Sequence, residues 1–460
     1  MARPSVERTT IPGLLVVHLD LHEDGRGWFE EIWHRATMTA LGLPDFGPVQ
    51  ANLSWNTSRG ATRGIHAEPW DKYVTVATGR AYGAWVDLRE GATFGQVVTR
   101  ELAPGVAVFV PRGVGNSFQT LEDGTAYSYL INRHWQADER YPSVRLDDPA
   151  VGIAWPIPLA QARVSEKDLS NPPLAELEPI RERRALVLGA GGQVGRALAE
   201  AFPGADAVSR RELDVTDTEA LAAWPWHDYD VVLNAAAYTD VDGAEDPEGR
   251  AAAWAVNAAA PAVLSRLATE HRLTLVHYST DYVFDGRRAE HREDEAPSPL
   301  GVYGQSKAAG DLGVAVTPRH YVVRSSWVVG DGSNFVRTMR RSAEQGASPS
   351  VVGDQIGRLT FASEIARGTR HLVDSGAPYG TYNVTNAGEP WSWADVAAEV
   401  FELAGRRRSD VVRVSTEQYA ATRPSAPRPP SSVLDLAKLR ATGFEPEDQR
   451  DALRAYWARP

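Results

Sequence analysis

The pattern of hydrophobic and polar positions differs between the two halves of the chain. Through the first 155 residues, apolar and polar positions alternate in short runs punctuated by glycine and proline, and residues 71–90 form two such runs around a glycine-containing turn. A regular series of short alternating strands predicts an all-β sandwich or barrel. From residue 183 onward, apolar runs such as 184–190 and 230–238 alternate with alanine-rich stretches of helical length. That pattern predicts a doubly wound parallel sheet with helices on both faces.

The chain of 460 residues is longer than a single hydrophobic core usually supports. The segment 170–184 separates the two patterns and holds three prolines followed by a run of charges. Prolines there block both helix and central strand. We therefore expect a first domain at residues 1–169, a linker at 170–182 and a second domain at 183–460.

Composition narrows the classes of partner and compartment. The chain has 43% hydrophobic and 23% charged residues, as globular proteins do, and its net charge of −12 argues against nucleic acid or an anionic membrane as a partner. The absence of cysteine excludes disulfides, thiolate catalysis and cysteine-ligated zinc. No apolar run approaches the ~18 residues of a membrane span, and the N-terminus lacks the apolar stretch of a signal peptide, so we expect a cytoplasmic protein.

Residues 185–195 indicate an apolar strand that enters a glycine-rich turn. Gly189, Gly192 and Gly195 recur at every third position, and a helix is expected to begin near Gln193. Glycines let the backbone approach a pyrophosphate, which then lies at the N-terminus of that helix. Such a turn can also be purely structural, so it does not decide the function alone.

A second pattern favours a nucleotide-dependent reductase. Tyr303 and Lys307 are four residues apart and share one face of a helix. A lysine ammonium near a phenol lowers the pKa of the tyrosine, which makes Tyr303 a proton donor to a carbonyl that receives hydride. Upstream, Ser279 and Thr280 end an apolar strand and offer a hydroxyl to the same carbonyl. The pair alone is typical of a solvated helix face, but the three features in this order favour a site.

Residues 184–458 resemble the extended short-chain dehydrogenase/reductase (Rossmann-type) family, and within it the dTDP-4-dehydrorhamnose reductases. The resemblance rests on GAGGQVG, NAAAYTDVDGAE, YSTDYVFDG, SPLGVYGQSKAAG and RSSWVVG. It implies Thr280, Tyr303 and Lys307 as the catalytic residues. The cofactor and substrate residues on this interpretation are the phosphate turn (Gly189, Gly192, Gln193, Val194, Gly195), Asp214 and Val215 near adenine, Ala235 and Ala236 near the ribose, and Trp327 near the sugar.

The second strand of this half, within DAVSRREL, bears on the choice of cofactor. Its C-terminal end lacks an acidic residue and offers Arg210 and Arg211 instead. Arginine at this place accepts a 2′-phosphate, so we expect NADPH, with NADH as the alternative if the arginines are merely exposed.

The densest polar chemistry of the first half lies in residues 50–74, where Arg63, His66 and Lys72 fall within ten residues. Metal-binding barrels of this type supply a His-x-His pair and a carboxylate; no such pair is present, so we expect a site without metal. A lone histidine is more often structural, but beside two cations it suits proton abstraction next to a carbonyl. His66 would be the base, Lys72 would stabilise the enolate and Arg63 would bind phosphate.

Residues 10–170 resemble the cupin-fold (jelly-roll) dTDP-4-dehydrorhamnose 3,5-epimerases. The matching segments include DGRGWFEE, RGIH, VPRGVGNSF and DDPAVGIAWP. The family implies a dyad of His66 with Asp168, Tyr129 as the acid on the opposite face of the sugar, and a homodimer. The nucleotide contacts that it implies are Arg26, Glu31, Gln50 and Asn52, with Trp135 as a stacking surface.

Asn116 departs from this family, which usually has histidine there. Asparagine does not shuttle protons near neutral pH, which leaves open whether C3 and C5 of the sugar are both inverted. The predicted function is a fusion that epimerises a dTDP-linked 4-keto-6-deoxy sugar and reduces its ketone to give dTDP-L-rhamnose; the residues do not distinguish dTDP from UDP. One alternative is a mono-epimerase joined to the reductase, and another is a reductase with a non-catalytic dimerisation module.

Overall fold

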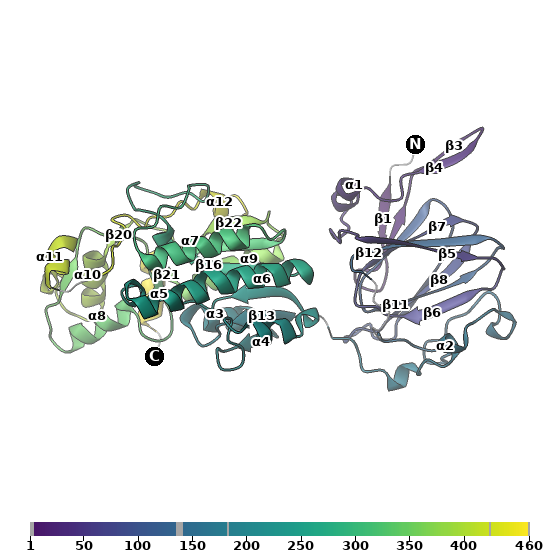
Figure 1. Cartoon of the computed structure of the whole chain (residues 1–460), viewed down its shortest axis with the longest axis horizontal. Coiled ribbons are helices and arrows are strands. Elements are labelled where there is room, and N and C mark those ends of the chain that lie inside the picture. The colour runs from purple at the N-terminus through teal and green to yellow at the C-terminus, as the bar shows by residue number, and fades with distance from the viewer. Residues whose placement is uncertain (1–3, 135–140, 182–183, 423–424, 459–460) are drawn as a thin grey trace. The chain divides into compact units, whose positions relative to one another are not determined.

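The computed structural model describes residues 4–134, 141–181, 184–422 and 425–458. The chain divides into two compact units, Met1–Glu182 and Arg183–Pro460, each with hydrophobic clusters of its own (Figure 1). In the described ranges, no helix is long and apolar enough to cross a bilayer.

Antiparallel strands build the first unit, as the alternating pattern predicts. They are β1 Ser5–Arg8, β2 Leu15–His18, β3 Leu21–Asp24, β4 Gly27–Glu30, β5 Gln50–Asn56, β6 Thr62–His66, β7 Lys72–Thr78, β8 Ala81–Asp87, β9 Val97–Leu102, β10 Val106–Val110, β11 Val114–Thr120 and β12 Thr125–Ile131. One sheet has the order β1-β2-β10-β7-β12-β5, a second has the order β6-β11-β8-β9, and β3 pairs with β4 as a hairpin. Val74 and Val108 of the first sheet meet Trp85 and Phe118 of the second in one buried cluster. The predicted all-β cupin architecture is confirmed.

The segment expected to be a linker packs against the first unit. This part of the chain holds the short helix α2 Glu166–Leu169 and a 3₁₀ turn at Leu174–Glu176; the other helical segments of the unit are α1 Arg35–Ala40 and a 3₁₀ turn at Leu159–Gln161. Leu174 is buried in a cluster with Ile65 and Val86. The Ile180 N–H donates to the Leu88 carbonyl at 2.7 Å. Proline removes only its own N–H, so neighbouring residues still pair, and the chain packs on the first unit as far as Ile180.

A six-stranded parallel sheet with helices on both faces forms the second unit, which confirms the predicted Rossmann-type fold. The strands are β13 Arg184–Leu188, β14 Asp206–Val208, β15 Tyr229–Asn234, β16 Thr274–Thr280, β17 His320–Ser325 and β22 Gly380–Asn383, in the order β14-β13-β15-β16-β17-β22. The helices that pack on it are α3 Gln193–Ala201, α4 Thr218–Ala223, α5 Pro247–Trp254, α6 Ala260–Glu270, α7 Val302–Ala315, α9 Ala362–Asp374 and α12 Ala437–Arg440, with a π-helical segment at Ala255–Ala259. Buried residues of α4, α6 and α7 cover one face, and those of α3, α9 and α12 cover the other.

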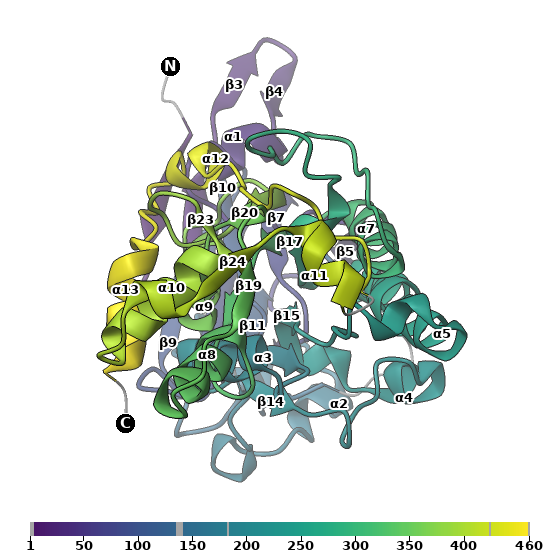
Figure 2. The same cartoon turned by 90° about the vertical axis from the view of Figure 1, so that its left-hand side faces the viewer.

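A third cluster lies beyond the carboxyl ends of these strands. Its elements are α8 Phe335–Glu344, α10 Trp393–Leu403, α11 Thr416–Thr422 and α13 Gln449–Trp457, with the short strands β18 Val328–Val329, β19 Ser350–Val352, β20 Ile356–Gly357, β21 Thr360–Phe361, β23 Trp391–Ser392 and β24 Val412–Val414. Figure 2 shows α8, α10 and α13 grouped near β19 and β24. Met339, Val396 and Leu453 bring the three helices into one core.

Candidate active sites

The first candidate site lies where β6 ends. His66, the last residue of β6, points its Nε2 at Asp168 Oδ1 of α2, 2.9 Å away. The Ser165 hydroxyl caps α2 by accepting from the Asp168 N–H at 3.1 Å. Burial raises the pKa of Asp168, but hydrogen bonds from His66 and Ser165 outweigh it and hold that pKa below its usual value. Asp168 is therefore a carboxylate at neutral pH, which suits it to orient His66.

Tyr129 and Lys72 lie on the paired strands β12 and β7, with Lys72 Nζ 5.4 Å from the centroid of the Tyr129 ring. The Lys72 ammonium also donates to Glu68 Oε1 at 2.5 Å, and both side chains are buried. Burial raises the pKa of Tyr129, and Glu68 and Tyr141 raise it further, while Arg63 opposes them. Tyr129 is thus held protonated, as an acid must be. We did not predict Glu68, although its spacing of four residues from Lys72 is a signal.

Three further predicted residues lie on β5 and β6 of the same unit. Arg63 Nε on β6 donates to Asn56 Oδ1 on β5 at 3.3 Å. Gln50 Nε2 donates to Asn52 Oδ1 at 2.8 Å, and Asn52 lies opposite Tyr129 in the register of β5 and β12. Asn52 therefore lies beside Tyr129, and Arg63 is close enough to lower the pKa of Tyr129.

Asn116 lies opposite His66 in the register of β11 and β6. Its Oδ1 accepts two hydrogen bonds, from Trp85 Nε1 at 2.9 Å and from the Tyr127 hydroxyl at 3.0 Å. Because an indole N–H can only donate, this contact fixes the orientation of the amide. The carbonyl end is held by Trp85 and Tyr127, so the NH₂ group is the end left for a ligand.

The remaining expectations for the first unit fall outside this cluster. Arg26 lies in the β3–β4 turn, pairs with Asp24 at 2.6 Å and has 91% of its side chain exposed. Glu31 follows β4 and is also exposed. Trp135 lies outside the described residues. In the described part of the chain, no group of three His, Cys, Asp or Glu side chains could hold a metal ion.

The second candidate site lies at the carboxyl end of the parallel sheet. Gly189 has φ +75°, and a Cβ there would lie 2.6 Å from the Ala236 nitrogen, so the turn after β13 approaches the end of β15 closely. A Cβ on Gly195 would overlap the Gly189 carbonyl. Helix α3 begins at Gln193 with Gly192 as its N-cap and without a side-chain cap. Its first N–H groups are free of side-chain partners, and this close glycine cradle fits the pyrophosphate of a dinucleotide.

Lys307 is buried between α7 and β16. Its Nζ donates to the Tyr278 carbonyl at 2.5 Å and lies 3.3 Å from His277 Nε2. Burial lowers the pKa of Lys307 to about 8, and Asp311 opposes this shift. We did not predict His277, which no local spacing connects to Lys307.

The electrostatics of Tyr303 differ from the expectation. Burial raises the pKa of Tyr303, and Asp281 raises it further, while a hydrogen bond with Thr280 acts in the opposite direction. Thr280 Oγ1 in turn donates to Asp281 Oδ1 at 2.9 Å, and burial raises the pKa of Asp281 to about 6. Lys307, which was expected to lower the pKa of Tyr303, is not among the groups that shift it, and its ammonium contacts the Tyr278 carbonyl and His277. Tyr303 is therefore a protonated phenol here.

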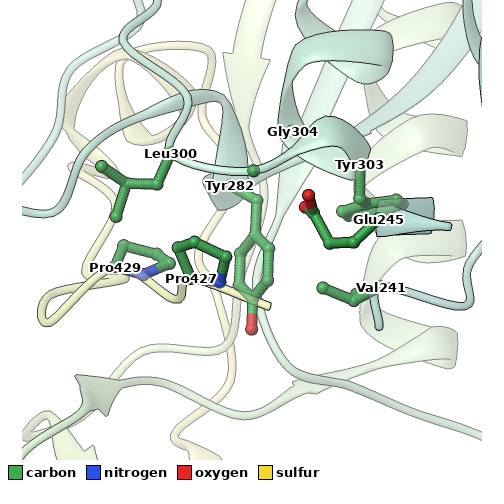
Figure 3. Close-up of a pocket in the computed structure, with 9 residues that line it drawn as sticks. Val241, Glu245, Tyr282, Leu300, Tyr303, Gly304, Pro427 and Pro429 are labelled. Carbon is green, nitrogen blue, oxygen red and sulfur yellow. The ribbon is translucent and has the colours of Figure 1, made fainter. Parts of the chain in front are cut away.

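Tyr303 lines a pocket in front of α7 (Figure 3). Its ring meets Tyr282 edge-on, with ring centroids 5.8 Å apart. Glu245 reaches the same pocket, and its Oε1 accepts from the Val302 N–H at 2.8 Å, which fixes the start of α7. Pro427 closes the pocket from the C-terminal segment.

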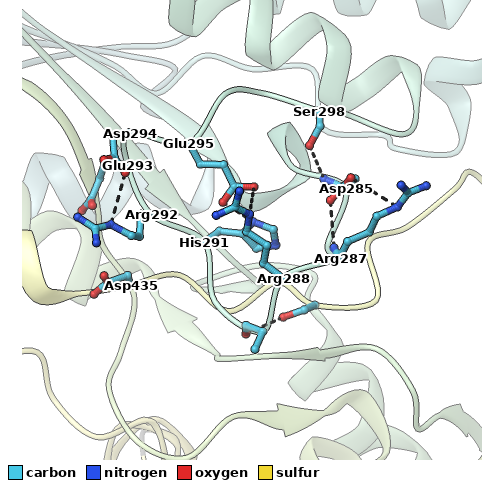
Figure 4. A network of polar contacts seen from close by, with 12 residues as sticks. Asp285, Arg287, Arg288, His291, Arg292, Glu293, Asp294, Glu295, Ser298 and Asp435 are labelled. Carbon is cyan, nitrogen blue, oxygen red and sulfur yellow. Dashed lines mark hydrogen bonds and ion pairs between the residues drawn. The ribbon is translucent and has the colours of Figure 1, made fainter.

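The loop that leads into α7 is held by its own polar contacts (Figure 4). His291 is fully buried, stacks on Phe284 and lies 3.0 Å from Glu295 through Nδ1. The Asp285 N–H donates to Ser298 Oγ at 3.1 Å. These contacts position the chain between the end of β16 and Tyr303.

The predicted adenine residues lie beyond β14. Arg210 Nε donates to Asp214 Oδ2 at 2.9 Å, and 81% of the Arg210 side chain is exposed. Val215 is buried in the core on the α6 side of the sheet. Glu212, which we did not predict, accepts from both the N–H and the hydroxyl of Ser209 at 2.8 Å.

Trp327 follows β17 with φ +45° and stacks on Trp393 with ring centroids 3.7 Å apart. It is 9% exposed and belongs to the cluster of α8 and α10. Val194 and Ala235 pack partly buried against the core on the α9 side of the sheet.

Comparison with known proteins decides the family of each unit. Residues 8–176 match the family model described as dTDP-4-dehydrorhamnose 3,5-epimerase, and residues 183–459 match the model described as RmlD substrate binding domain. The chain belongs to both families. It is accordingly a bifunctional isomerase and oxidoreductase of the dTDP-L-rhamnose pathway, and its reductase unit is of the NAD(P)H-using kind.

Individual relatives cover each unit almost completely. The chain is 43% identical over 180 residues to a "Protein RmlC homolog" of Streptococcus pyogenes serotype M6, a match that covers 38% of this chain and 90% of that protein. It is 37% identical over 285 residues to a dTDP-4-dehydrorhamnose reductase of Mycolicibacterium smegmatis, covering 60% of this chain and 85% of the relative. A crystal structure of dTDP-4-dehydrorhamnose reductase from Bacillus anthracis in complex with NADP shares 31% identity at a TM-score of 0.56, covering 60% of this chain and 99% of that one.

Proposed function

We propose that the chain performs two consecutive reactions: 3,5-epimerisation of dTDP-4-dehydro-6-deoxy-D-glucose in the first unit, then reduction of its C4 ketone to dTDP-L-rhamnose in the second. The observation that carries the proposal is that each unit gathers its own proton-transfer residues. His66 lies 2.9 Å from Asp168 in the first unit. Thr280 ends β16 in the second, beside Tyr303 and Lys307 of α7. A first unit that served only for dimerisation would need no such dyad.

The epimerase chemistry starts from the ketone, which acidifies the protons on C3 and C5 because the carbanion delocalises onto O4. His66 takes the proton, and Asp168 stabilises the imidazolium that forms. Tyr129 returns a proton from the opposite face, for which its raised pKa keeps it protonated. Lys72 stabilises the enolate oxygen, with its position set by Glu68.

Substrate binding in the first unit involves the residues around this centre. Arg63 binds the phosphates, and Gln50 and Asn52 contact the nucleotide.

NAD(P)H, when bound, supplies the hydride that reaches C4. Tyr303 donates its proton to O4, Thr280 donates to O4 once its hydroxyl turns from Asp281, and the Lys307 ammonium stabilises the phenolate that forms. The glycine turn at 189–195 holds the pyrophosphate, and Trp327 contacts the sugar. The exposed Arg210 at the end of β14 favours NADPH through its 2′-phosphate, with NADH as the alternative.

A homodimer through the first unit is supported by apolar surface on β4 and β5. Phe29 is 68% exposed, Leu53 64% and Trp55 58%. Leu53 and Trp55 share the exposed face of β5, and large apolar side chains grouped on a surface in this way are typical of a protein–protein interface. The hairpin that carries Arg26 and Glu31 would then serve nucleotide binding in a second copy. We place the enzyme in the cytoplasm, where nucleotide sugars and NADPH are available, and expect no nucleic-acid partner at a net charge of −12.

A mono-epimerase joined to the reductase is the second candidate, and Asn116 is the observation that favours it. The carbonyl of Asn116 is held by Trp85 and Tyr127, and Asn116 lies opposite His66 in the register of β11 and β6, so we assign its NH₂ group to the sugar. It can donate a hydrogen bond to the sugar but cannot carry a proton. Inversion at one carbon only would give a different 6-deoxy sugar.

The deciding experiment supplies the purified chain with the dTDP-linked 4-keto sugar and NADPH in deuterated water. We expect cofactor oxidation, and NMR of the product should show deuterium and inverted configuration at both C3 and C5. His66→Ala should lose deuterium incorporation and still bind NADPH, while Tyr303→Phe should keep the exchange and lose the reduction. Deuterium at one carbon only would support the second candidate. If His66→Ala incorporates deuterium as the unaltered chain does, the proposal is wrong.

A further inference from the structure

A buried chain of polar side chains runs from β15 through β16 to Lys307. His277 on β16 is fully buried, with Nε2 3.3 Å from Lys307 Nζ and Nδ1 3.2 Å from Asn234 Nδ2 on β15. Asn234 is 1% exposed. On α7, a Cβ at Gly310 would overlap the Asn257 carbonyl oxygen and would also lie 3.3 Å from His277 Nε2, so the helix packs closely on both residues. The proposed reactions do not involve His277, yet it contacts one of their residues directly.

The hydrogen-bond partners determine which nitrogen of His277 carries the hydrogen. Burial and the neighbouring Lys307 lower the pKa of His277 well below its usual value, so the ring is neutral, with one N–H and one acceptor. A lysine ammonium can only donate, so Nε2 must accept from Lys307 and Nδ1 must carry the hydrogen. Among the described residues, Asn234 Oδ1 is a buried oxygen without a partner. A half-turn of the Asn234 amide brings that oxygen to Nδ1, where it accepts the ring hydrogen, and moves the NH₂ group to the former position of the oxygen.

We propose that His277 is a positioning residue for the reductase: its neutral Nε2 accepts one hydrogen of the Lys307 ammonium, the Tyr278 carbonyl accepts a second, and the third is left for the cofactor and the phenol of Tyr303. An ammonium has three donors on a flexible stem, so two fixed acceptors determine where the third donor points. This inference rests on the proposed function, in which Lys307 acts as an ammonium during reduction.

His277 also helps Lys307 to keep its charge. The titratable and charged groups around Lys307 are Asp311 and Tyr303 on α7, Arg324 on β17, and Tyr278 and Asp281 at the end of β16. Asp311 opposes the lowering of the Lys307 pKa, but it is already paired with Arg324 at 3.0 Å. Neutral acceptors therefore carry much of the stabilisation of the ammonium. Loss of the His277 acceptor should lower the pKa of Lys307 further.

The chain has only four lysines, Lys72, Lys167, Lys307 and Lys438, so each can be followed by NMR after labelling lysine with carbon-13 at Cε. The titration uses the full chain without cofactor, and Lys307→Arg identifies the signal. His277→Leu removes the acceptor at similar volume, and His277→Gln keeps an acceptor oxygen. The matched control is His291→Leu, a fully buried histidine of the same unit that contacts Glu295 instead.

We expect Lys307 to titrate near pH 8 in the unaltered chain. A hydrogen bond from the ammonium to His277 stabilises the charged form of Lys307. Its loss in His277→Leu should therefore lower the titration midpoint of Lys307 by about one pH unit. His277→Gln and His291→Leu should leave it close to the original value. The alkaline limb of the reductase pH profile should move in the same direction in His277→Leu and be restored in His277→Gln. A purely structural role would lower the rate without moving that limb.

Two outcomes would overturn the inference. One is a midpoint that stays unchanged in His277→Leu; the other is a midpoint that rises, as expected if His277 donates to a neutral amine. Long-range proton–nitrogen spectra of the unaltered protein give an answer even if the variant does not fold: we expect His277 to be protonated on Nδ1, and protonation on Nε2 refutes the proposal. If the chain reduces no 4-keto sugar but Lys307 titrates as expected, the proposed function fails and the His277 contact stands.

Discussion

Replacing Asp168 by asparagine tests the first site most directly. The substitution keeps the shape of the side chain and removes its charge, 2.9 Å from His66 Nε2. The side chain of Asp168 is only 8% exposed, so water screens the interaction little. A hydrogen bond between a charged group and its partner contributes about 1.5–3 kcal/mol. At about 1.4 kcal/mol per factor of ten, the epimerisation rate should fall by about 10- to 100-fold.

The assay measures deuterium incorporation into the 4-keto sugar in deuterated water without NADPH, which isolates the first unit. Reduction of a sugar that has already been epimerised serves as an internal control and should be unaffected. Asp87→Asn is the matched variant, because Asp87 is a buried carboxylate of the same unit that is bound to Arg89 rather than to the site. Asp87→Asn should lower the free energy of unfolding of the first unit but leave the deuterium exchange rate of the folded enzyme unchanged. Exchange at the unaltered rate in Asp168→Asn would refute the dyad.

Three further substitutions probe other contacts. Lys307→Met abolishes reduction but removes a buried charge whose pKa falls from 10.5 to about 8 on folding. Calorimetry should show a melting temperature about 2–4 °C higher at pH 7; the gain should shrink as the pH rises above 8 and disappear only above pH 10.5, where the lysine is neutral in both states. Gly195→Ala places a Cβ against the preceding turn and should weaken NADPH binding by about tenfold or more in a fluorescence titration, whereas Gly313→Ala, whose Cβ would meet only ordinary contacts, should bind normally. Glu68→Gln removes a carboxylate that raises the pKa of Tyr129, so the alkaline limb of the epimerase pH profile should move to lower pH; an unmoved limb would contradict the assigned cause.

Features that depend on local spacing could be predicted from the sequence. The glycines at 189, 192 and 195 predicted a strand–turn–helix, and the structure has β13 followed by α3. Tyr303 and Lys307 share α7 because four residues make about one helical turn. Asp168 was assigned only through family resemblance, since 102 residues separate it from His66.

Features that depend on tertiary packing could not be predicted. Asn234 and His277 are 43 residues apart and meet only because β15 and β16 are neighbours in the sheet. The raised pKa of Tyr303 reflects burial, which helical spacing does not reveal. Prolines near residue 172 suggested an open connection, but Leu174 behind them fills the core of the first unit.

The packing of residues 170–180 determines where the chain can be divided into its two units. Ile180 is hydrogen-bonded to the first unit, and β13 begins at Arg184, so three residues join the two enzymes. A cut after residue 169 would remove Leu174 and Ile180 from their partners and expose apolar surface, whereas a cut within 181–183 would leave both pieces with complete cores.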